Sequence, residues 1–238
     1  MRAELTIVIP ARNESQSLPK LLTSLNRQDY LRLPDTRVFV ADANSTDGTA
    51  EIARSFPARF RVEIILGGLP SVGRNAGAHR ATTPYVLFLD ADVVLADSTL
   101  LRRAVTTMQK RHLHCLTTNV ACIEGNAADR FLYQASNIVQ QASRWVAPFA
   151  TGMFMLFDRQ EFERLGGFNE QALYAEDYLL SKQVARRRFA VIHGTVLTSN
   201  RRFQKMGHMQ IAAMFLKTAL HSGDESYFRR DHGYWEES

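Results

Sequence analysis

Two carboxylates, Asp90 and Asp92, follow an apolar run from Val86 to Leu89, with only Ala91 between them. Hard divalent cations such as Mg²⁺ and Mn²⁺ bind oxygen ligands and keep waters and phosphate groups as further partners. Two acids at the end of a rigid strand are therefore suited to holding a cation together with a diphosphate. The Asp-x-Asp spacing alone is weak support, because adjacent acids in a turn are usually solvated or cap a helix.

The apolar run before Asp90 is one of several segments that predict an alternation of strands and helices. β-Branched and other apolar runs predict strands at residues 5–10, 37–42, 61–66 and 85–90. Helical spacing of apolar residues predicts helices at residues 18–25, 45–56, 73–81 and 97–108. This order favours an α/β fold with a mostly parallel sheet flanked by helices, whose ligands bind beyond the carboxyl ends of the strands. Asp42 ends the second strand, so we expect it to face the same crevice as Asp90.

The second half of the chain has longer helices and fewer strands. Helices are predicted at residues 127–146, 158–165, 176–188 and 209–223. Strands are predicted at residues 150–157 and 189–199. Asp158 caps the short helix, and Gly166 and Gly167 end it. No linker, repeat or low-complexity tract separates the two halves, so we expect two lobes of one domain.

Composition places the chain among ordinary soluble globular proteins. It has 238 residues, of which 45% are hydrophobic and 22% charged, enough to bury one substantial core. No window has the roughly 18 consecutive apolar residues of a membrane span. Arg2 and Glu4 interrupt the stretch where a signal peptide would be apolar. We therefore expect a cytoplasmic protein.

Cysteines and arginines add two further expectations. Cys115 and Cys122 match neither a zinc pair nor a redox Cys-x-x-Cys motif, so both are interpreted as free thiols. The net charge of +5 is modest, but arginines gather late in the chain. They lie at residues 186–188, 201–202 and 229–230. This asymmetry indicates a nearby anion, which could be a phosphate, a nucleic acid or an acidic membrane surface.

Six motifs occur in a fixed order over about residues 5–205. They are TIVIPARNE (Thr6–Glu14), ADANSTDGT (Ala41–Thr49), SVGRNAGAHRA (Ser71–Ala81), FLDAD (Phe88–Asp92), GGFNE (Gly166–Glu170) and AEDYLL (Ala175–Leu180). Through them the chain resembles the glycosyltransferase family 2 enzymes, which have the GT-A fold and use nucleotide-diphosphate sugars. The resemblance implies a single Rossmann-like GT-A domain over residues 1–238. Its parts are a nucleotide-sugar-binding half (1–95), a smaller acceptor-side half (96–205), and a C-terminal helix and tail (206–238).

The resemblance implies a donor site built from the first four motifs. The nucleoside would be surrounded by Pro10, Ala11, Arg12 and Glu14. Asp42 would contact the base, because a carboxylate accepts the imide N–H of a uracil-type ring. Beneath the nucleotide would lie Gly73, Arg74 and Asn75, with Arg74 offering charge to phosphate. The plainer alternatives are a surface salt bridge for Arg74 and turn or helix-cap roles for Asp42 and Asp47; for Asp47 the plainer role is favoured.

The resemblance also implies roles for the acids in binding a divalent cation and in catalysis. Asp90 and Ala91 would contact the sugar nucleotide, and Asp92, together with Asp90, would ligate Mn²⁺ or Mg²⁺. Asp177 would be the general base of an inverting transfer, with Glu176 as its neighbour in the acceptor site. The alternative for these two is that acids favour the first turn of a helix.

Three basic residues match the family less closely. His193 would be a third metal ligand, although a lone histidine on a strand is more often structural. Arg201 and Arg202 would close over the diphosphate, or would simply belong to a basic loop.

The partners implied are a UDP- or GDP-sugar donor and a hydroxyl acceptor, with a lipid-linked acceptor left open. The helix at 209–223 is interpreted as core packing by default. With Arg229, Arg230, Tyr234 and Trp235 it could instead lie on an anionic membrane, giving a peripheral contact at its inner face. No nucleic acid is expected, because such a partner would leave the acids unexplained.

Two other functions compete with sugar transfer. A sugar-phosphate nucleotidyltransferase normally begins with a glycine-rich loop, whereas the segment IPARNESQSLPK contains no glycine. A non-catalytic nucleotide-binding scaffold protein would keep the fold and lose the acids, whereas Asp42, Asp90, Asp92 and Asp177 are all present.

Overall fold

The structure is a computed structural model that describes residues 3–230, apart from the side chains of residues 219 and 225. The expected membrane contacts of Tyr234 and Trp235 lie outside the described residues.

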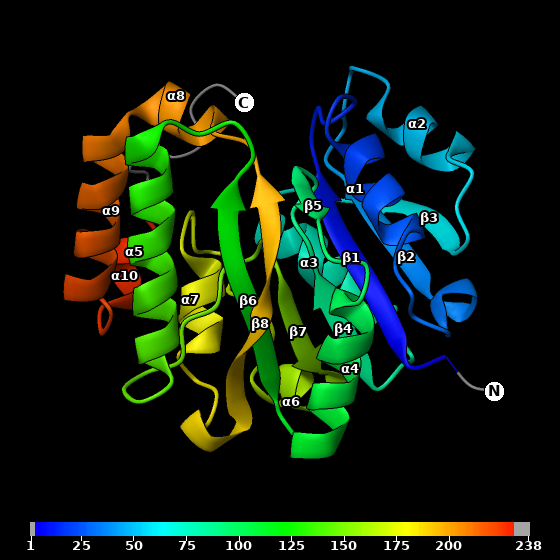
Figure 1. Cartoon of the computed structure of the whole chain (residues 1–238). Coiled ribbons are helices and arrows are strands. Elements are labelled where there is room, and N and C mark those ends of the chain that lie inside the picture. The colour runs from blue at the N-terminus through cyan, green and yellow to red at the C-terminus, as the bar shows by residue number, and fades with distance from the viewer. Residues whose placement is uncertain (1–2, 231–238) are drawn as a thin grey trace.

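One curled eight-stranded sheet runs through the described chain in the order β3-β2-β1-β4-β7-β6-β8-β5 (Figure 1). Neighbours among β1 to β4 are parallel, as are β6 and β8, while β7 is antiparallel to both its neighbours and β5 is antiparallel to β8. The strands are β1 (Leu5–Ala11), β2 (Arg37–Asp42), β3 (Arg61–Leu66), β4 (Tyr85–Phe88), β5 (Val93–Leu95), β6 (Cys115–Cys122), β7 (Met155–Asp158) and β8 (Phe189–Thr198). The carboxyl ends of β1, β2 and β4 therefore meet at one edge, as predicted.

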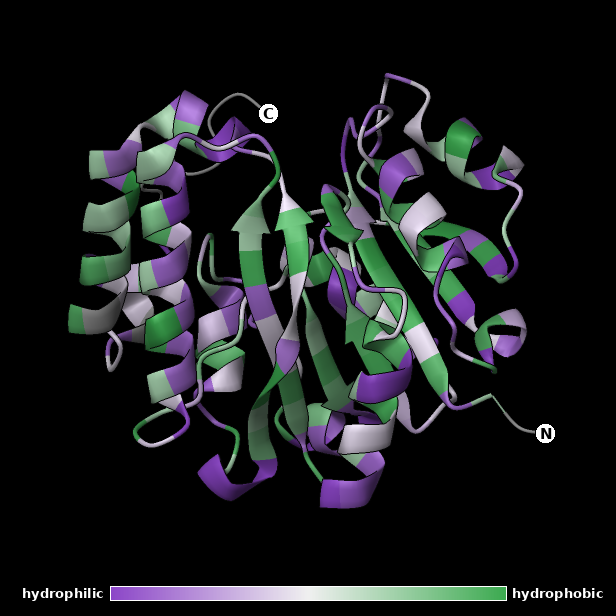
Figure 2. Ribbon diagram, viewed as in Figure 1, coloured by the Kyte–Doolittle hydropathy of each residue, from purple (hydrophilic) through white to green (hydrophobic). Residues whose placement is uncertain are grey.

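Helices cover both faces of this sheet. They are α1 (Leu18–Asn26), α2 (Thr49–Ser55), α3 (Pro70–His79), α4 (Leu100–Arg111), α5 (Ala127–Ser143), α6 (Arg159–Arg164), α7 (Glu176–Ser181), α8 (Arg201–Met206), α9 (His208–Leu220) and α10 (Glu225–Phe228). Two 3₁₀ turns span Leu33–Asp35 and Arg186–Arg188. In Figure 2 the strands are mostly green, the apolar colour, whereas the purple of hydrophilic residues occurs mainly on the helices and loops.

Side chains of β1 alternate between two cores, because successive residues of a strand point to opposite faces. Leu5, Ile7 and Ile9 pack with α1 and α4 on one face. Val8 packs on the other face with α3, α6 and α7. A Cβ on Gly77 of α3 would lie 2.4 Å from Val8 Cγ1, so α3 approaches the sheet more closely than a larger residue would permit.

Two strands of the sheet were not predicted from the sequence. Strand β6 was not predicted, because its centre contains Thr117, Thr118 and Asn119. The two threonines are buried, and their hydroxyls donate to the carbonyls of Phe154 and Ile192, which offsets their polarity. The three-residue strand β5 was also missed.

Two predicted elements are shorter than expected. The helix predicted at 176–188 ends at Ser181, because the chain turns there to enter β8 and the Val184 N–H bonds the Ser181 carbonyl. The strand predicted from residue 150 begins at Met155, after a turn in which the Phe154 N–H bonds the Thr151 carbonyl.

Both cysteines are free thiols, as predicted. Among the helices formed by the described residues, none has the length and apolar character needed to cross a membrane.

Candidate functional site

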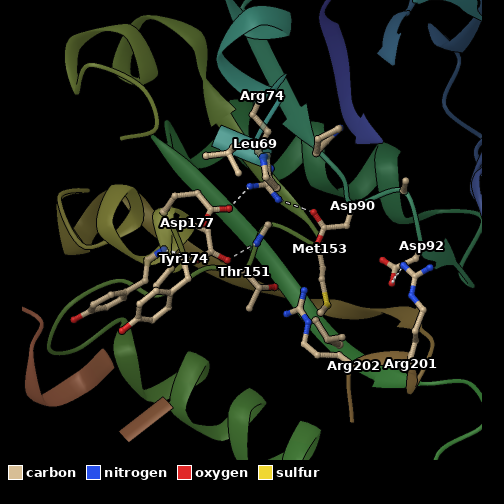
Figure 3. Close-up of a pocket in the computed structure, with 18 of the residues that line it drawn as sticks. Leu69, Arg74, Asp90, Asp92, Thr151, Met153, Tyr174, Asp177, Arg201 and Arg202 are labelled. Atoms are coloured by element: carbon tan, nitrogen blue, oxygen red, sulfur yellow. Dashed lines mark hydrogen bonds and ion pairs between the residues drawn. The ribbon is translucent and has the colours of Figure 1, made fainter. Parts of the chain in front are cut away.

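A cavity of about 670 Å³ opens at the carboxyl ends of β1 and β4 and extends to α5, α7, α8 and α9 (Figure 3). Twelve of the predicted site residues line it, and four do not. The twelve are Pro10, Ala11, Arg12, Glu14, Arg74, Asp90, Ala91, Asp92, Glu176, Asp177, Arg201 and Arg202. The fold thus gathers residues that lie far apart in the sequence.

Arg74 of α3 joins the two halves of the site. Its guanidinium donates to Asp90 Oδ1 at 2.6 Å and to Glu176 Oε1 at 2.6 Å, and it lies over the Phe168 ring. It packs so closely on Gly152 that a Cβ there would lie 2.2 Å from Nη2. The side chain of Arg74 is only 4% exposed, so the surface salt bridge considered above is excluded.

Asp177 is held beside this ion-pair network by two backbone N–H groups. Gly152 donates to Oδ2 and Tyr178 donates to Oδ1, each at 2.8 Å. Burial and the nearby charge of Glu176 raise the pKa of Asp177 above that of an ordinary aspartate, although Arg74 and the two N–H groups oppose the shift. Its carboxylate therefore has a fixed orientation and increased basicity.

Asp92 lies where three carboxylates converge. Burial and the charges of Asp90 and Glu14 raise its pKa to about 6, even though Arg201 and Arg202 act in the opposite direction. Arg201 pairs with Glu14 at 2.5 Å and lies 3.6 Å from Asp92 Oδ2. The cluster therefore retains a surplus of negative charge.

This donor set fits a hard divalent cation. No group of three or more His, Cys, Asp or Glu side chains within residues 3–230 is arranged to enclose a metal ion. Mg²⁺ is nevertheless commonly held by one or two carboxylates plus substrate phosphates rather than by a complete protein cage. Asp90 and Asp92 supply that number of carboxylates, and both line the cavity.

Asp42 and Asp47 have different roles in the loop after β2. Asp47 accepts hydrogen bonds from the backbone N–H groups of Ser15 and Thr49 and from the Thr49 hydroxyl, and these bonds lower its pKa. This confirms the favoured turn role of Asp47. Asp42 Oδ2 accepts from the Ser45 N–H at 3.2 Å, whereas Oδ1 is buried without a hydrogen-bond partner among the described residues.

Asp42, Gly73, Asn75 and His193 are the predicted site residues that do not line the cavity. Asn75 instead holds the GGFNE loop: it exchanges hydrogen bonds with both backbone groups of Phe168 and donates to Glu170. Gly73 faces Ala41 and Pro10, so its small size serves helix packing. The places of Gly73 and Asn75 beneath a nucleotide therefore stay predictions, and the contacts seen for both residues are packing and loop contacts.

His193 lies too far along β8 to complete a metal site with Asp92. Val93, the residue after Asp92, pairs with Thr198 near the end of β8. His193 is nearer the start of that strand, roughly 16 Å away at the rise of an extended residue. Its side chain is exposed, and its carbonyl accepts a hydrogen bond from Arg103. This geometry gives no support to His193 as a third ligand beside Asp92.

An apolar part of the cavity was missed entirely by the sequence-based site prediction. It is lined by Leu132, Tyr133, Phe149, Met153, Tyr174, Tyr178, Ile211, Met214 and Phe215. These residues come from α5, α7, α9 and two loops, so no local motif unites them. Ile211, Met214 and Phe215 form a helical stripe that sequence alone does not distinguish from core packing.

Comparison with known proteins gives matches in sequence and in fold. Validoxylamine A glucosyltransferase of Streptomyces hygroscopicus subsp. jinggangensis is 37% identical over 94 residues, which are 38% of this chain and 22% of that protein. The 4,4'-diaponeurosporenoate glycosyltransferase of Staphylococcus haemolyticus is 34% identical over 112 residues, 45% of this chain and 29% of that protein. The chain thus matches less than a third of the length of each of these relatives.

Two solved structures share the fold at low sequence identity. The mannosyltransferase PcManGT from Pyrobaculum calidifontis, in complex with GDP-Man and Mn²⁺, gives a TM-score of 0.67 at 22% identity, covering 91% of this chain and 65% of that chain. TarS of S. aureus in complex with UDP gives a TM-score of 0.63 at 19% identity, covering 85% and 62%. These neighbours establish the GT-A fold.

The family assignment comes from the sequence profile of glycosyl transferase family 2, which matches residues 6–166. The match spans most of the chain and includes the predicted donor motifs and both acids of FLDAD. The protein therefore belongs to glycosyl transferase family 2.

Proposed function

We propose that this glycosyltransferase moves a sugar from a UDP- or GDP-sugar to a hydroxyl acceptor, with inversion at the anomeric carbon and with a divalent cation. The observation that carries the proposal is the network in which Arg74 links Asp90, at the donor side, to Glu176, the neighbour of Asp177. Family membership argues against the nucleotidyltransferase and scaffold alternatives.

The donor would occupy the polar part of the cavity. Pro10, Ala11, Arg12 and Glu14 line the space proposed for the nucleoside. The unpartnered Oδ1 of Asp42 supports a contact with a base N–H, because a buried polar atom without a hydrogen bond is costly. The GDP-Man and UDP complexes of the structural neighbours support this class of donor.

Asp90 and Asp92 would hold Mn²⁺ or Mg²⁺ beside the diphosphate. When bound, such a cation neutralises the charge of the departing diphosphate. Arg201 and Arg202 line the same side of the cavity and would add positive charge there. Arg201 would exchange its present partners, Glu14 and Asp92, for the diphosphate.

Asp177 would act as the general base of a single displacement. As the acceptor oxygen bonds to the anomeric carbon, its proton passes to the Asp177 carboxylate. The bond from that carbon to the diphosphate oxygen breaks, and its electron pair leaves with the diphosphate. Attack opposite the leaving group inverts the anomeric configuration, and the raised pKa of Asp177 suits proton transfer near neutral pH.

Thermal unfolding with UDP and GDP tests the donor and cation together. Either nucleotide should raise the melting temperature in the presence of Mn²⁺ or Mg²⁺ and lose that effect with chelator, because a ligand of the native state stabilises it. Asp92→Ala should abolish the cation-dependent shift, whereas Asp35→Ala, at an exposed acid elsewhere, should keep it. A chelator-independent shift in the parent would contradict the proposed cation site. Hydrolysis of a panel of nucleotide sugars would identify the donor.

Exposed apolar residues on the outer face of α9 support a peripheral contact of the protein with the inner face of an anionic membrane. Met209, Leu216 and Leu220 are exposed there, and Lys217 adds positive charge on the same helix. Cosedimentation should therefore occur with vesicles containing phosphatidylglycerol and fall with Leu216→Gln. Equal binding to purely phosphatidylcholine vesicles would exclude the electrostatic part of this contact.

A further inference from the structure

The cavity has two chemically different ends. Figure 3 shows Asp92, Arg201 and Arg202 on one side and Tyr174 and Asp177 on the other, with Asp90 between them. The first end carries charged groups throughout. The second is lined mainly by aliphatic and aromatic side chains from α5, α9 and the segments 149–153 and 174–178.

The apolar end faces open space rather than sealed core. Leu132, Tyr133, Phe149 and Met214 are each only partly buried, and Phe215 is 51% exposed. Phe149 and Tyr178 pack edge to face at 6.0 Å, which holds an aromatic wall in place. Apolar surface left in contact with water is a source of binding free energy for an apolar ligand.

Asp177 lies at the junction of the two ends. It lies in the first turn of α7, three residues after Tyr174, and the hydrogen bond that Gly152 donates to it places it beside Met153. A hydroxyl at Asp177 therefore has the donor end on one side and the apolar end on the other. A small polar acceptor would leave the apolar wall without a partner.

We infer that the acceptor is an amphiphile, with its hydroxyl at Asp177 and an apolar chain or ring system between α5 and α9. This inference rests on the proposed function for the role of the hydroxyl, and it adds the substrate class. Binding of the apolar portion depends on the inner faces of the two helices. It is therefore separate from the membrane contact proposed for the outer face of α9.

The neutral fluorophore N-phenyl-1-naphthylamine is a probe for this end of the cavity in the absence of lipid. It should bind the full chain and be displaced by n-dodecanol at concentrations where n-butanol has no effect. Leu132→Gln and Met214→Gln place an amide in the cavity from α5 and α9 and should each weaken probe binding by about tenfold. Ile138→Gln and Leu216→Gln make matched changes on the outer faces, where the side chains are 70% and 63% exposed, and should leave it unchanged.

The outcomes separate this inference from the proposed function, because the shift in melting temperature with nucleotide and cation is measured on the same preparations. Cavity variants that lose the probe and keep the nucleotide shift support an amphiphilic acceptor. The inference is overturned if the parent protein binds nucleotide but not the probe. It is also overturned if the inner-face and outer-face variants lose probe binding equally. Probe binding and dodecanol displacement without any nucleotide shift would support an apolar ligand and overturn the proposed function instead.

Discussion

The proposed donor and acceptor ends of the cavity are built on different kinds of support. Charged groups of the donor end follow strands β1 and β4, whose apolar residues are almost fully buried, and Arg74 fixes Asp90 by a direct ion pair. The acceptor end depends on α5 and α9, which carry exposed apolar residues on their outer surfaces. Rigid elements hold reacting groups more precisely than mobile ones. The groups proposed for the chemistry therefore lie on buried strands and a buried ion pair, whereas the apolar end lies between two surface helices.

The largest effect is expected at the junction of the two ends. Asp177→Asn keeps the shape of the side chain and removes its basicity, so transfer should fall by roughly two or more orders of magnitude. Cation-dependent nucleotide binding should persist, because the donor end is unchanged. Initial rates and melting temperatures measure the two properties, and NMR of the product should show an inverted anomeric centre. Near-parental turnover or a retained configuration would remove Asp177 from the mechanism.

A second large effect concerns the link between the two ends. Arg74→Ala leaves Asp90 and Glu176 without their shared countercharge, and breaking a buried pair typically costs about 3–5 kcal/mol of unfolding free energy. Arg54→Ala removes an exposed pair with Glu51 and should cost no more than about 1 kcal/mol. Urea unfolding compares the two variants. Similar losses would mean that the Arg74 network does not hold the ends together.

A smaller effect should follow from the contact between Gly152 and Arg74. The Cβ of Gly152→Ala would meet the guanidinium and displace it, together with the N–H that orients Asp177. Misplacement of a reacting group should lower turnover by about tenfold or more. Gly223→Ala is the control, because a Cβ there meets no atom within 4 Å. Unchanged turnover in Gly152→Ala would show that this end tolerates displacement.

The smallest predicted effect is a displacement of the pH profile. Burial and Glu176 raise the pKa of Asp177, while Arg74 and the N–H groups of Gly152 and Tyr178 lower it. Because the base must be ionised, kcat/KM for the acceptor should decline on the acid side at a higher pH than an ordinary aspartate would give. Ionising this buried group also costs free energy, so its contribution to folding stability is lost as pH rises. Asp177→Asn should remove that part of the pH dependence of unfolding, and an unaltered profile would contradict the shift.

The sequence predicted the donor end far better than the acceptor end. Asp90 and Asp92 could be predicted from the sequence because they end an apolar run that is long enough to be recognised as a strand. Asp177 and Glu176 belong to a motif, although their spacing also suits a helix start. Met214 and Leu132 carry no such signal, since an apolar residue facing a cavity has the same local pattern as one facing a core. Asn75 and His193 do not line the cavity, and chain order does not show which face of a helix, or which part of a strand, reaches it.

Because β5 pairs with β8, the length of the connection after β8 helps to determine where Arg201 lies relative to the acids. Val93 lies opposite Thr198, so the acid motif is attached to the strand that leads into Arg201 through Ser199 and Asn200. Deleting or inserting one residue in this connection would displace the start of α8 relative to the acids. Arg201 would then turn away from Glu14 and Asp92, with every side chain in the cavity still of the same type. Homologous chains that differ in the length of this connection should accordingly differ in which basic residue faces the donor.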